Sequence, residues 1–295
     1  AAKNGCPKSD RVLRSLFYLN RLVEDNNTVD LGYILKEFKV SARFKRDFRQ
    51  YIKYWLKEVK LEQSFDLITS PLEKIARSGP NGKSKWETAD IEAIALVNSP
   101  LWEPFQEFAE LTGNQSLVEY IKMFSADKCK STRTTYNNTK LRYLTSIPDS
   151  ANKSRTVAIS DYWTLVLLNP LMKSVQEIIL NIFPDYTSLK SHEKGFQNLR
   201  KAIRVGINSY DISSWTDAFP AEIQKIVMEE IYSPELSNAW YSLVVTCDWE
   251  VKGMSSSVKY ATGQGMGTPG SFDIATLTDM LVLFYIYKEH YGIDL

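Results

Sequence analysis

The feature that most constrains this chain is a glycine-rich segment, residues 263–270, placed directly before a long apolar stretch. Four of these eight residues are glycine, and the apolar stretch over residues 271–290 predicts a helix. Glycine lets a backbone adopt positive φ and approach a neighbour closely, and a helix N-terminus favours anions. The spacing differs from both the Walker loop and the dinucleotide fingerprint. The pattern therefore predicts a loop that approaches a ligand closely, with a plain connecting loop as the alternative.

Two aspartates, Asp211 and Asp217, precede this loop by roughly fifty residues. Residues 206–211 read as a strand, so Asp211 would present its carboxylate rigidly from a strand end. Magnesium usually takes one or two carboxylates together with phosphates and water, and nucleotidyl transfer uses two such ions. Asp217 would face the same site and accept a hydrogen bond from a ribose hydroxyl. The alternative is a turn and a helix-capping pair in front of Pro220.

Composition places few limits on function. The chain has 295 residues and a net charge of +1, so any positive charge that binds nucleic acid must be local. Its three cysteines lie far apart without metal-ligand spacing, which is typical of reduced thiols in an intracellular protein. Two histidines are too few for a histidine-based metal site. The longest apolar run, residues 280–287, is far short of the roughly twenty residues that span a membrane.

Hydrophobic periodicity predicts an α+β chain that is rich in helices. The first half reads as helical, and short strands appear only after residue 140. Glycine, proline and asparagine mark a clear loop over residues 77–85. We expect helices over residues 9–24, 41–61, 88–97, 103–111, 117–124, 161–182, 221–231, 235–243 and 271–290, and strands over residues 141–147, 155–159, 206–211 and 257–262.

Two basic segments are candidates for phosphate binding. Lys153 and Arg155 lie between a predicted turn and a strand, where two cations could neutralise an incoming triphosphate. A solvated strand edge is the alternative. The predicted helix over residues 41–61 carries an aromatic stripe on one face and basic residues on another. Such a helix can track an RNA backbone, but more often the stripe is core and the charges are solvated. The residues that would bind RNA here are Arg46, Arg49 and Lys53.

Four segments together resemble a known family. Residues 153–171 resemble the basic strand and following helix of RNA polymerases from narnavirus- and mitovirus-like capsidless RNA viruses. Residues 211–220, with the pattern D-x-S-x-x-T-D-x-x-P, resemble the first palm motif of these polymerases. Residues 263–272 resemble the second palm motif, and are also similar to the Met-Gly loop of RNA phage replicases. The sequence S-G-P-N-G over residues 78–82 is similar to a loop of mitovirus-like polymerases. The matches come in the right order and cover roughly residues 78–285.

The resemblance implies RNA-directed RNA synthesis, in viral genome replication, by two-metal-ion nucleotidyl transfer with Mg²⁺ or Mn²⁺. It also implies the fold of a right-hand polymerase, limited to fingers and a partial palm. A helical N-terminal extension and fingers would occupy residues 1–140. Fingers with the basic strand for incoming nucleotides would occupy residues 141–205, and the first two palm motifs residues 206–295.

The resemblance also assigns roles to single residues. Asp211 would carry a catalytic metal ion, and Asp217 would read the ribose 2′-hydroxyl. The residues expected at the bound nucleotide are Lys153, Arg155, Gly267 and Ser271, and those of the loop expected at RNA are Gln264 and Gly265.

Two departures from the family pattern matter. Many viral polymerases carry Asn four residues after the Ser of the glycine loop, and here that position is Ala275, so the support of Asp217 is open. No Gly-Asp-Asp sequence occurs in the chain, and the third palm motif and the thumb are missing. We therefore expect an incomplete subunit that needs either a second polypeptide carrying Gly-Asp-Asp or its own missing C-terminal part. Its other partners would be RNA template, nascent strand and nucleoside triphosphates, in the host cytoplasm or mitochondrion.

Two other functions remain open from the sequence. One is a non-enzymatic RNA-binding protein derived from a viral polymerase, which would bind RNA with steep salt dependence. The other is a reverse transcriptase, because residues 264–269 faintly echo the glutamine-glycine loop of that class. Reverse transcriptases usually place a bulky group, not an acid such as Asp217, where the ribose hydroxyl would sit.

Overall fold

A computed structural model describes residues 28–61, 66–69, 72, 74–128, 138–149, 153–184, 193, 195–197, 200 and 212–292. The helix predicted over residues 9–24 and the strand predicted over residues 206–211 lie outside these residues. The described part is helix-rich with a small mixed sheet, as the sequence predicts for an α+β protein.

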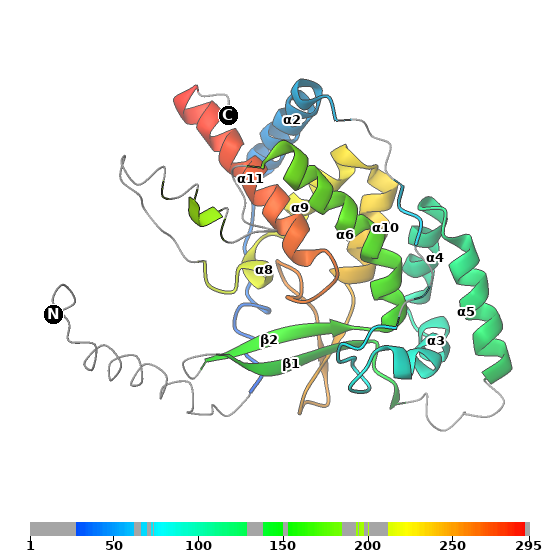
Figure 1. Ribbon diagram of the computed structural model, residues 1–295. Helices are drawn as coiled ribbons and strands as arrows, with labels where there is room; N and C mark the ends of the chain where they lie inside the picture. The colour runs from blue at the N-terminus through cyan, green and yellow to red at the C-terminus, as the bar shows by residue number, and fades with distance from the viewer. Residues whose placement is uncertain are drawn as a thin grey trace, which may run out of the picture.

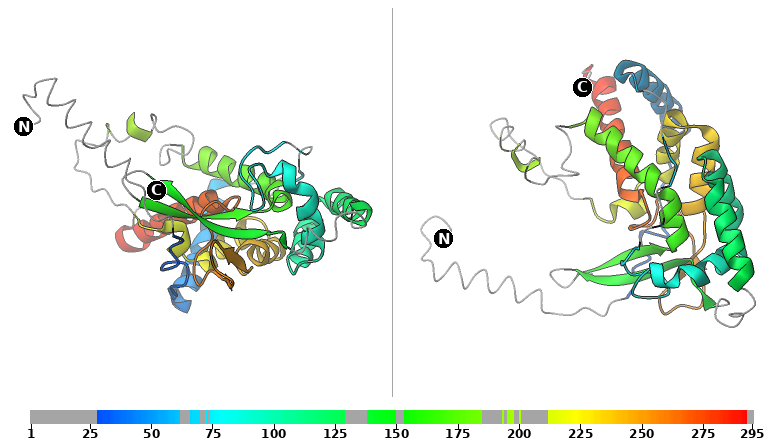
Figure 2. Two further views of the ribbon diagram at one scale, coloured as in Figure 1. Left: turned by 90° about the horizontal axis from the view of Figure 1, so that it is seen from below. Right: turned by 45° about the vertical axis from the view of Figure 1, so that its right-hand side comes forward.

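A four-stranded sheet with the order β2-β1-β3-β4 lies along one end of the helices (Figure 1). Strands β1 (Arg142–Asp149) and β2 (Lys153–Ser160) form a long antiparallel hairpin. Strand β3 (Trp249–Val251) pairs in parallel with β1, and the two-residue β4 (Ser257–Val258) pairs antiparallel with β3. The right-hand view of Figure 2 shows the β1–β2 hairpin projecting to one side below the helices.

Two strand predictions need correction, and one strand was missed. Strand β1 runs to Asp149, two residues into the predicted turn, and Pro148 is paired opposite Ser154. Strand β3 was not predicted, because three residues are too few to show an alternating pattern. The strand predicted over residues 257–262 ends at Val258. Beyond it, the backbone groups of Ala261 and Thr262 bond to Ile34 and Ala221 instead of a sheet partner.

Nine described helices cover one face of the sheet or pack beside it. Ser41 caps α2, Asp161 caps α6 and Ser233 caps α10, each accepting a hydrogen bond from a backbone N–H three residues on. The bounds of most helices agree with the predicted ones within two residues, and α5 is longer. The helices are α2 (Ala42–Val59), α3 (Ala89–Val97), α4 (Trp102–Leu111), α5 (Gln115–Lys128), α6 (Tyr162–Ile182), α8 (Trp215–Ala218), α9 (Ala221–Ile231), α10 (Pro234–Val244) and α11 (Ser271–Tyr291). A 3₁₀ turn, η1 (Trp86–Thr88), precedes α3.

One hydrophobic core joins most of these helices. It includes Phe48 of α2, Leu168 of α6 and Leu277 of α11, which are all buried. These residues come from each of the three predicted regions, so the three regions share one core. A second, smaller cluster lies against the sheet and contains Ile34, Leu144, Ala158, Cys247, Trp249, Val251 and Tyr260.

Helix α6 is long and apolar enough to cross a membrane by length and composition alone. In this structure its apolar residues contribute to the main core, where Leu167, Leu171 and Val175 are buried. The length and apolar composition of α6 are therefore also those of a core helix.

A buried network of charged side chains fixes the base of the hairpin to the helices. The Arg142 guanidinium donates to Asp161, and both side chains are almost fully buried. The same guanidinium also donates to the Thr164 hydroxyl and to the Leu243 carbonyl, each at 3.1 Å. Residues of β1, α6 and α10 are thus joined through one side chain.

Glu92 of α3 is the second centre of this network. Its Oε1 accepts hydrogen bonds from Asn81 Nδ2 and Thr88 Oγ1, both at 2.8 Å, and its Oε2 accepts one from the Tyr162 N–H at 2.7 Å. Burial raises the pKa of Glu92 to about 7. Nearby, Lys85 donates to the Ser160 carbonyl at the end of β2, and burial lowers its pKa. The loop over residues 78–82 therefore supports the network, with Asn81 as its contact.

Candidate active site

A cavity of about 470 Å³ lies where three predicted motifs meet. It is lined by the basic strand β2, by the turn leading into α8, and by the glycine loop together with the start of α11. The lining residues are Asp30, Tyr33, Ser154, Arg155, Thr156, Ile212, Ser213, Ser214, Trp215, Thr216, Asp217, Met266, Gly267, Ser271 and Phe272. Segments more than a hundred residues apart in the sequence are thus brought to one place.

Gly263 brings the glycine loop against the acidic turn. A Cβ atom on Gly263 would lie 2.2 Å from the Thr216 carbonyl oxygen and 2.4 Å from that of Asp217, which no side chain tolerates. Beside it, the Gln264 N–H donates to the Thr216 carbonyl at 2.9 Å. The glycine is therefore needed for backbone-to-backbone contact, one of the two roles that glycine in such a loop can play.

Gly267 brings the same loop against the basic strand. It adopts φ of 101°, a conformation that favours glycine, and a Cβ there would lie 2.8 Å from the Ala158 carbonyl oxygen. The Ala158 N–H donates to the Met266 carbonyl at 2.7 Å. The loop thus ties β2 to the α8 turn and fixes the walls of the cavity.

Asp217 lies in the wall of the cavity and is only 7% exposed. Its Oδ1 atom is buried and has no hydrogen-bond partner among the described residues. Burial raises the pKa of Asp217 to about 6, and the negative charge of Asp30 adds to this shift. A buried, unsatisfied carboxylate is costly, and it suits a ligand that brings a hydrogen-bond donor.

The backbone just before Asp217 is strained. Ser214 adopts φ of 48°, in the left-handed region that residues other than glycine rarely occupy. Such conformations cost about 1–3 kcal/mol and cluster at functional sites. Here the strained residue is the N-cap of α8, the single turn that carries Asp217.

The other residues predicted at the nucleotide lie as follows. Arg155, Gly267 and Ser271 line the same cavity as Asp217. Lys153 is the first residue of β2, opposite Asp149 of β1. Asp211 lies outside the described residues, so its predicted metal-binding role stays a prediction. Among the residues that the structure describes, no three His, Cys, Asp or Glu side chains come together as a metal site.

Gln264 and Gly265, predicted to contact RNA, are buried inside the loop. The Gln264 side chain donates to the Gln224 side-chain oxygen of α9 and is fully buried. A Cβ on Gly265 would lie 2.4 Å from the Ala158 side chain. Both residues are therefore placed to hold the loop rather than to touch a ligand.

Helix α2 docks through both of its faces. Its predicted aromatic stripe is confirmed as core, with Phe48 and Trp55 buried. Arg49 pairs with Glu229 and, at 2.7 Å, with Glu230 of α9, and Lys53 lies 3.9 Å from Glu230. Arg46 pairs with its neighbour Asp47 at 3.0 Å. None of these three basic residues lines the cavity at Asp217.

The sequence did not point to Asp30 or Tyr33. Asp30 and Tyr33 belong to residues 28–40, a strap without hydrophobic periodicity. The strap is held by hydrogen bonds between Asp30 and the Thr156 hydroxyl and by the Ala261 N–H, which donates to the Ile34 carbonyl at 2.9 Å. No local signal marks such residues, because only the tertiary fold brings them to the cavity.

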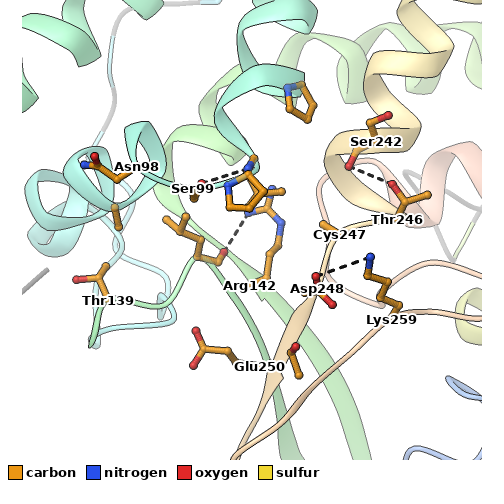
Figure 3. A pocket seen from close by; sticks show the side chains of 16 residues that line it. Asn98, Ser99, Thr139, Arg142, Ser242, Thr246, Cys247, Asp248, Glu250 and Lys259 are labelled. Carbon is orange, nitrogen blue, oxygen red and sulfur yellow. Dashed lines mark hydrogen bonds and ion pairs between the residues drawn. The ribbon is translucent and has the colours of Figure 1, made fainter. Parts of the chain in front are cut away.

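A second cavity of about 600 Å³ is lined by Arg142, Cys247, Asp248, Lys259 and neighbours (Figure 3). Among the residues that line it, Lys259 pairs with Asp248 at 3.8 Å. Burial raises the pKa of the Cys247 thiol, which disfavours the reactive thiolate. No residue predicted to bind nucleotide, metal or RNA lines this cavity, so it is not the candidate site.

A basic strand, an acidic turn and a glycine loop thus lie around one cavity. The sequence profile of the mitovirus RNA-dependent RNA polymerase family matches residues 58–287. The chain therefore belongs to this family. It is similar to the RNA-directed RNA polymerase of Cryphonectria parasitica mitovirus 1 (strain American chestnut tree/New Jersey/NB631), with 27% identity over 230 residues. That match covers 70% of this chain and 26% of the relative, so the chain spans about a quarter of the length of the polymerase it matches.

Proposed function

We propose that this chain forms the ribonucleotide-binding part of a viral RNA-directed RNA polymerase, active in RNA replication inside host cells. The observation that carries the proposal is the cavity in which Arg155, Asp217, Gly267 and Ser271 meet. These four residues come from three separate motifs, and the sequence predicts each of them at the bound nucleotide.

In this proposal each group has a chemical task. Arg155 neutralises triphosphate charge with a planar, bidentate donor. The Asp217 carboxylate accepts a hydrogen bond from the ribose 2′-hydroxyl, which gives its unsatisfied Oδ1 a partner. Gly267 holds the glycine loop against β2 at the cavity wall, and Ser271 begins α11 at the same wall.

Asp211 is proposed to hold a catalytic Mg²⁺ or Mn²⁺ ion. A hard oxygen donor fits such an ion, which takes few protein ligands and several phosphate oxygens. When bound, the ions would neutralise charge on the triphosphate and on the attacking 3′-oxygen. The remaining aspartates, of a Gly-Asp-Asp motif, would come from further polypeptide, either a continuation of this chain or a second subunit.

Nucleotide binding by this chain tests the first part of the proposal. Calorimetric titration with adenosine, AMP, ADP and ATP should show affinity rising with each phosphate. Arg155→Gln should lower the affinity for ATP about tenfold, because a charge-assisted contact is lost. The rise in affinity along the series should therefore be smaller. Arg43→Gln, on the exposed face of α2, is the matched control and should leave the series unchanged. An unchanged series in Arg155→Gln would contradict the proposal.

RNA synthesis tests the second part. The chain would be combined with polypeptide that carries Gly-Asp-Asp, and template-dependent incorporation of ribonucleotides would be measured with Mg²⁺ present. We expect incorporation with the wild-type chain and none with Asp211→Ala. Full incorporation in that variant would remove Asp211 from the active site. Binding of RNA with steep salt dependence, but without incorporation for any partner, would instead favour a non-enzymatic RNA-binding protein.

A further inference from the structure

A further cavity of about 770 Å³, which we call the adjoining cavity, shares part of its wall with the candidate active site. The residues common to both cavities are Gly267, Ser271 and Phe272, where the glycine loop leads into α11. The remaining wall comes from residues 74–77 and from α6. A ligand in the adjoining cavity would therefore lie directly beside a nucleotide bound in the candidate active site.

The exposed charges of the adjoining cavity are positive. Lys74 and Arg77 both line it, and both are exposed. Neither forms an ion pair with an acid among the described residues. The acid in the lining, Asp273, is only 6% exposed and accepts a hydrogen bond from Gln176 of α6 at 3.1 Å. Two cations without acidic partners in one cavity wall suit a ligand that brings phosphate groups.

Hydrogen bonds hold the backbone of the segment that carries these two cations. The Arg77 carbonyl accepts from the Lys85 N–H at 2.9 Å, and the Ile75 carbonyl accepts from the Ser84 hydroxyl at 3.1 Å. Lys85 is itself buried and donates to the Ser160 carbonyl at the end of β2. The segment is therefore tied to the strand that also lines the candidate active site.

Phe272 is an exposed aromatic residue in the wall between the two cavities. It is 55% exposed, although it lies in the first turn of α11. Its ring packs edge-on against that of Trp215, with ring centroids 5.6 Å apart and an interplanar angle of 79°. Trp215 packs in turn against Phe219, with ring centroids 5.9 Å apart. The Phe272 ring is thus held by a second ring, while about half of the residue's surface is open to a ligand.

We infer that the adjoining cavity binds a single strand of RNA, with Lys74 and Arg77 at its phosphates and Phe272 stacked on one of its bases. Proteins that bind single strands combine a basic groove with aromatic rings on which bases stack. Both parts occur here in one cavity. The inference rests on the proposed function, because the strand lies beside a nucleotide only if the candidate active site binds one. The base on Phe272 would then lie next to the base of the incoming nucleotide.

Binding of a labelled oligouridine of about eight nucleotides to the full chain tests the charged part. Fluorescence anisotropy at several salt concentrations gives the affinity and its salt dependence. Lys74→Gln/Arg77→Gln should reduce the slope of log affinity against log salt by about 1.4, because each phosphate contact on a single strand contributes about 0.7. Arg43→Gln/Lys122→Gln is the matched control, because it removes two exposed cations that line neither cavity.

The same assay tests the aromatic part. Phe272→Ala should weaken binding about tenfold and leave the salt slope unchanged, because it removes base stacking and no phosphate contact. Phe272→Trp should restore the affinity. An oligomer of abasic riboses should bind Phe272→Ala and the wild type equally, which a collapse of the cavity wall would not allow. Tyr291→Ala removes an exposed ring at the other end of α11 and is the control.

Titration with ATP in the absence of RNA separates this inference from the proposed function. Lys74→Gln/Arg77→Gln should bind ATP like the wild type, because these cations lie outside the lining of the candidate active site. Weaker ATP binding with unchanged RNA binding would assign both cations to the triphosphate and overturn the inference. A wild type that binds no oligouridine, or an unchanged salt slope in this variant, would also overturn it. Absence of ATP binding by the wild type would contradict the proposed function instead.

Discussion

Two carboxylates, Glu92 in the charged network and Asp217 in the cavity wall, are both buried, and burial disfavours the charged form of each. Their surroundings differ. Burial raises the pKa of both, to about 7 for Glu92 and about 6 for Asp217. Glu92 receives three hydrogen bonds from Asn81, Thr88 and Tyr162. Asp217 keeps one buried oxygen without a partner.

The number of hydrogen bonds that each carboxylate receives distinguishes a structural carboxylate from a candidate ligand-binding one more clearly than the two pKa shifts do. The protein itself satisfies Glu92, and the network around it joins the hairpin to three helices. The protein leaves Asp217 unsatisfied, beside a strained backbone and facing a cavity. A cost that the fold does not offset locally is expected where a ligand supplies the missing partner.

The largest effect should come from breaking the charged network. In Arg142→Met, the fully buried Asp161 loses its guanidinium partner, and an unpaired buried charge typically costs about 3–5 kcal/mol. Urea unfolding at pH 7 measures the loss. Arg43→Met, at an exposed position of α2, should change stability by less than about 0.5 kcal/mol. A loss of stability in Arg142→Met as small as that in Arg43→Met would show that the network does not stabilise the fold.

The contact between loop and turn should be nearly as sensitive. Gly263→Ala places a Cβ within 2.5 Å of the Thr216 and Asp217 backbone, so the two segments must separate. We expect a loss of about 3 kcal/mol, the upper part of the usual range for overpacking, together with weaker ATP binding. Gly253→Ala has open space around it and only a positive φ of 81°, so it should cost about 1 kcal/mol and leave ATP binding intact. Equal effects of the two variants would contradict the close packing.

Asp217→Ala and Glu92→Ala should change the free energy of unfolding in opposite directions. The pKa of Asp217 is raised in the folded state, so its contribution to stability is complete below about pH 4 and is lost as pH rises through about 6. Asp217→Ala should therefore raise the free energy of unfolding at pH 8, by about 1–3 kcal/mol, and the gain should vanish near pH 4. Glu92→Ala leaves three donors without an acceptor and should lower it by about 2–4 kcal/mol at pH 5.5, where Glu92 is mostly protonated.

Unfolding curves at pH 4, 5.5 and 8 measure both variants under the same conditions. Destabilisation by Asp217→Ala at pH 8 as large as that by Glu92→Ala at pH 5.5 would remove the distinction between the two sites.

The smallest effect should come from α2. Its Arg49 is partly exposed and paired with Glu229 and Glu230, so Arg49→Ala should cost at most about 1 kcal/mol at low salt and less at high salt. Thermal unfolding at two salt concentrations checks this. If Arg49 also binds RNA, as the sequence predicts, the variant should in addition lower the salt slope of RNA binding. A salt-independent stability loss above 2 kcal/mol would mean that the side chain acts through packing.

The sequence predicts the helices of this chain better than its contacts. Apolar spacing and capping residues such as Ser41 and Asp161 are local, so they define α2 and α6 without knowledge of the fold. Strand β3 has three residues and depends on pairing with β1, which no local pattern encodes. The motif residues Arg155, Asp217 and Gly267 could be predicted because their types suit the chemistry. Asp30 and Tyr33 could not, because only the folded chain brings them to the cavity.

The central claim is that Asp217 reads the sugar of a ribonucleotide bound in the cavity. The most direct measurement is the ratio of ATP to 2′-deoxyATP affinity at pH 8 for the wild type and Asp217→Ala. We predict a ratio of about ten for the wild type and near one for the variant, with 2′-deoxyATP binding retained. A wild-type ratio of one, or an undiminished ratio in Asp217→Ala, would contradict the account, and a preference for 2′-deoxyATP would point to reverse transcription.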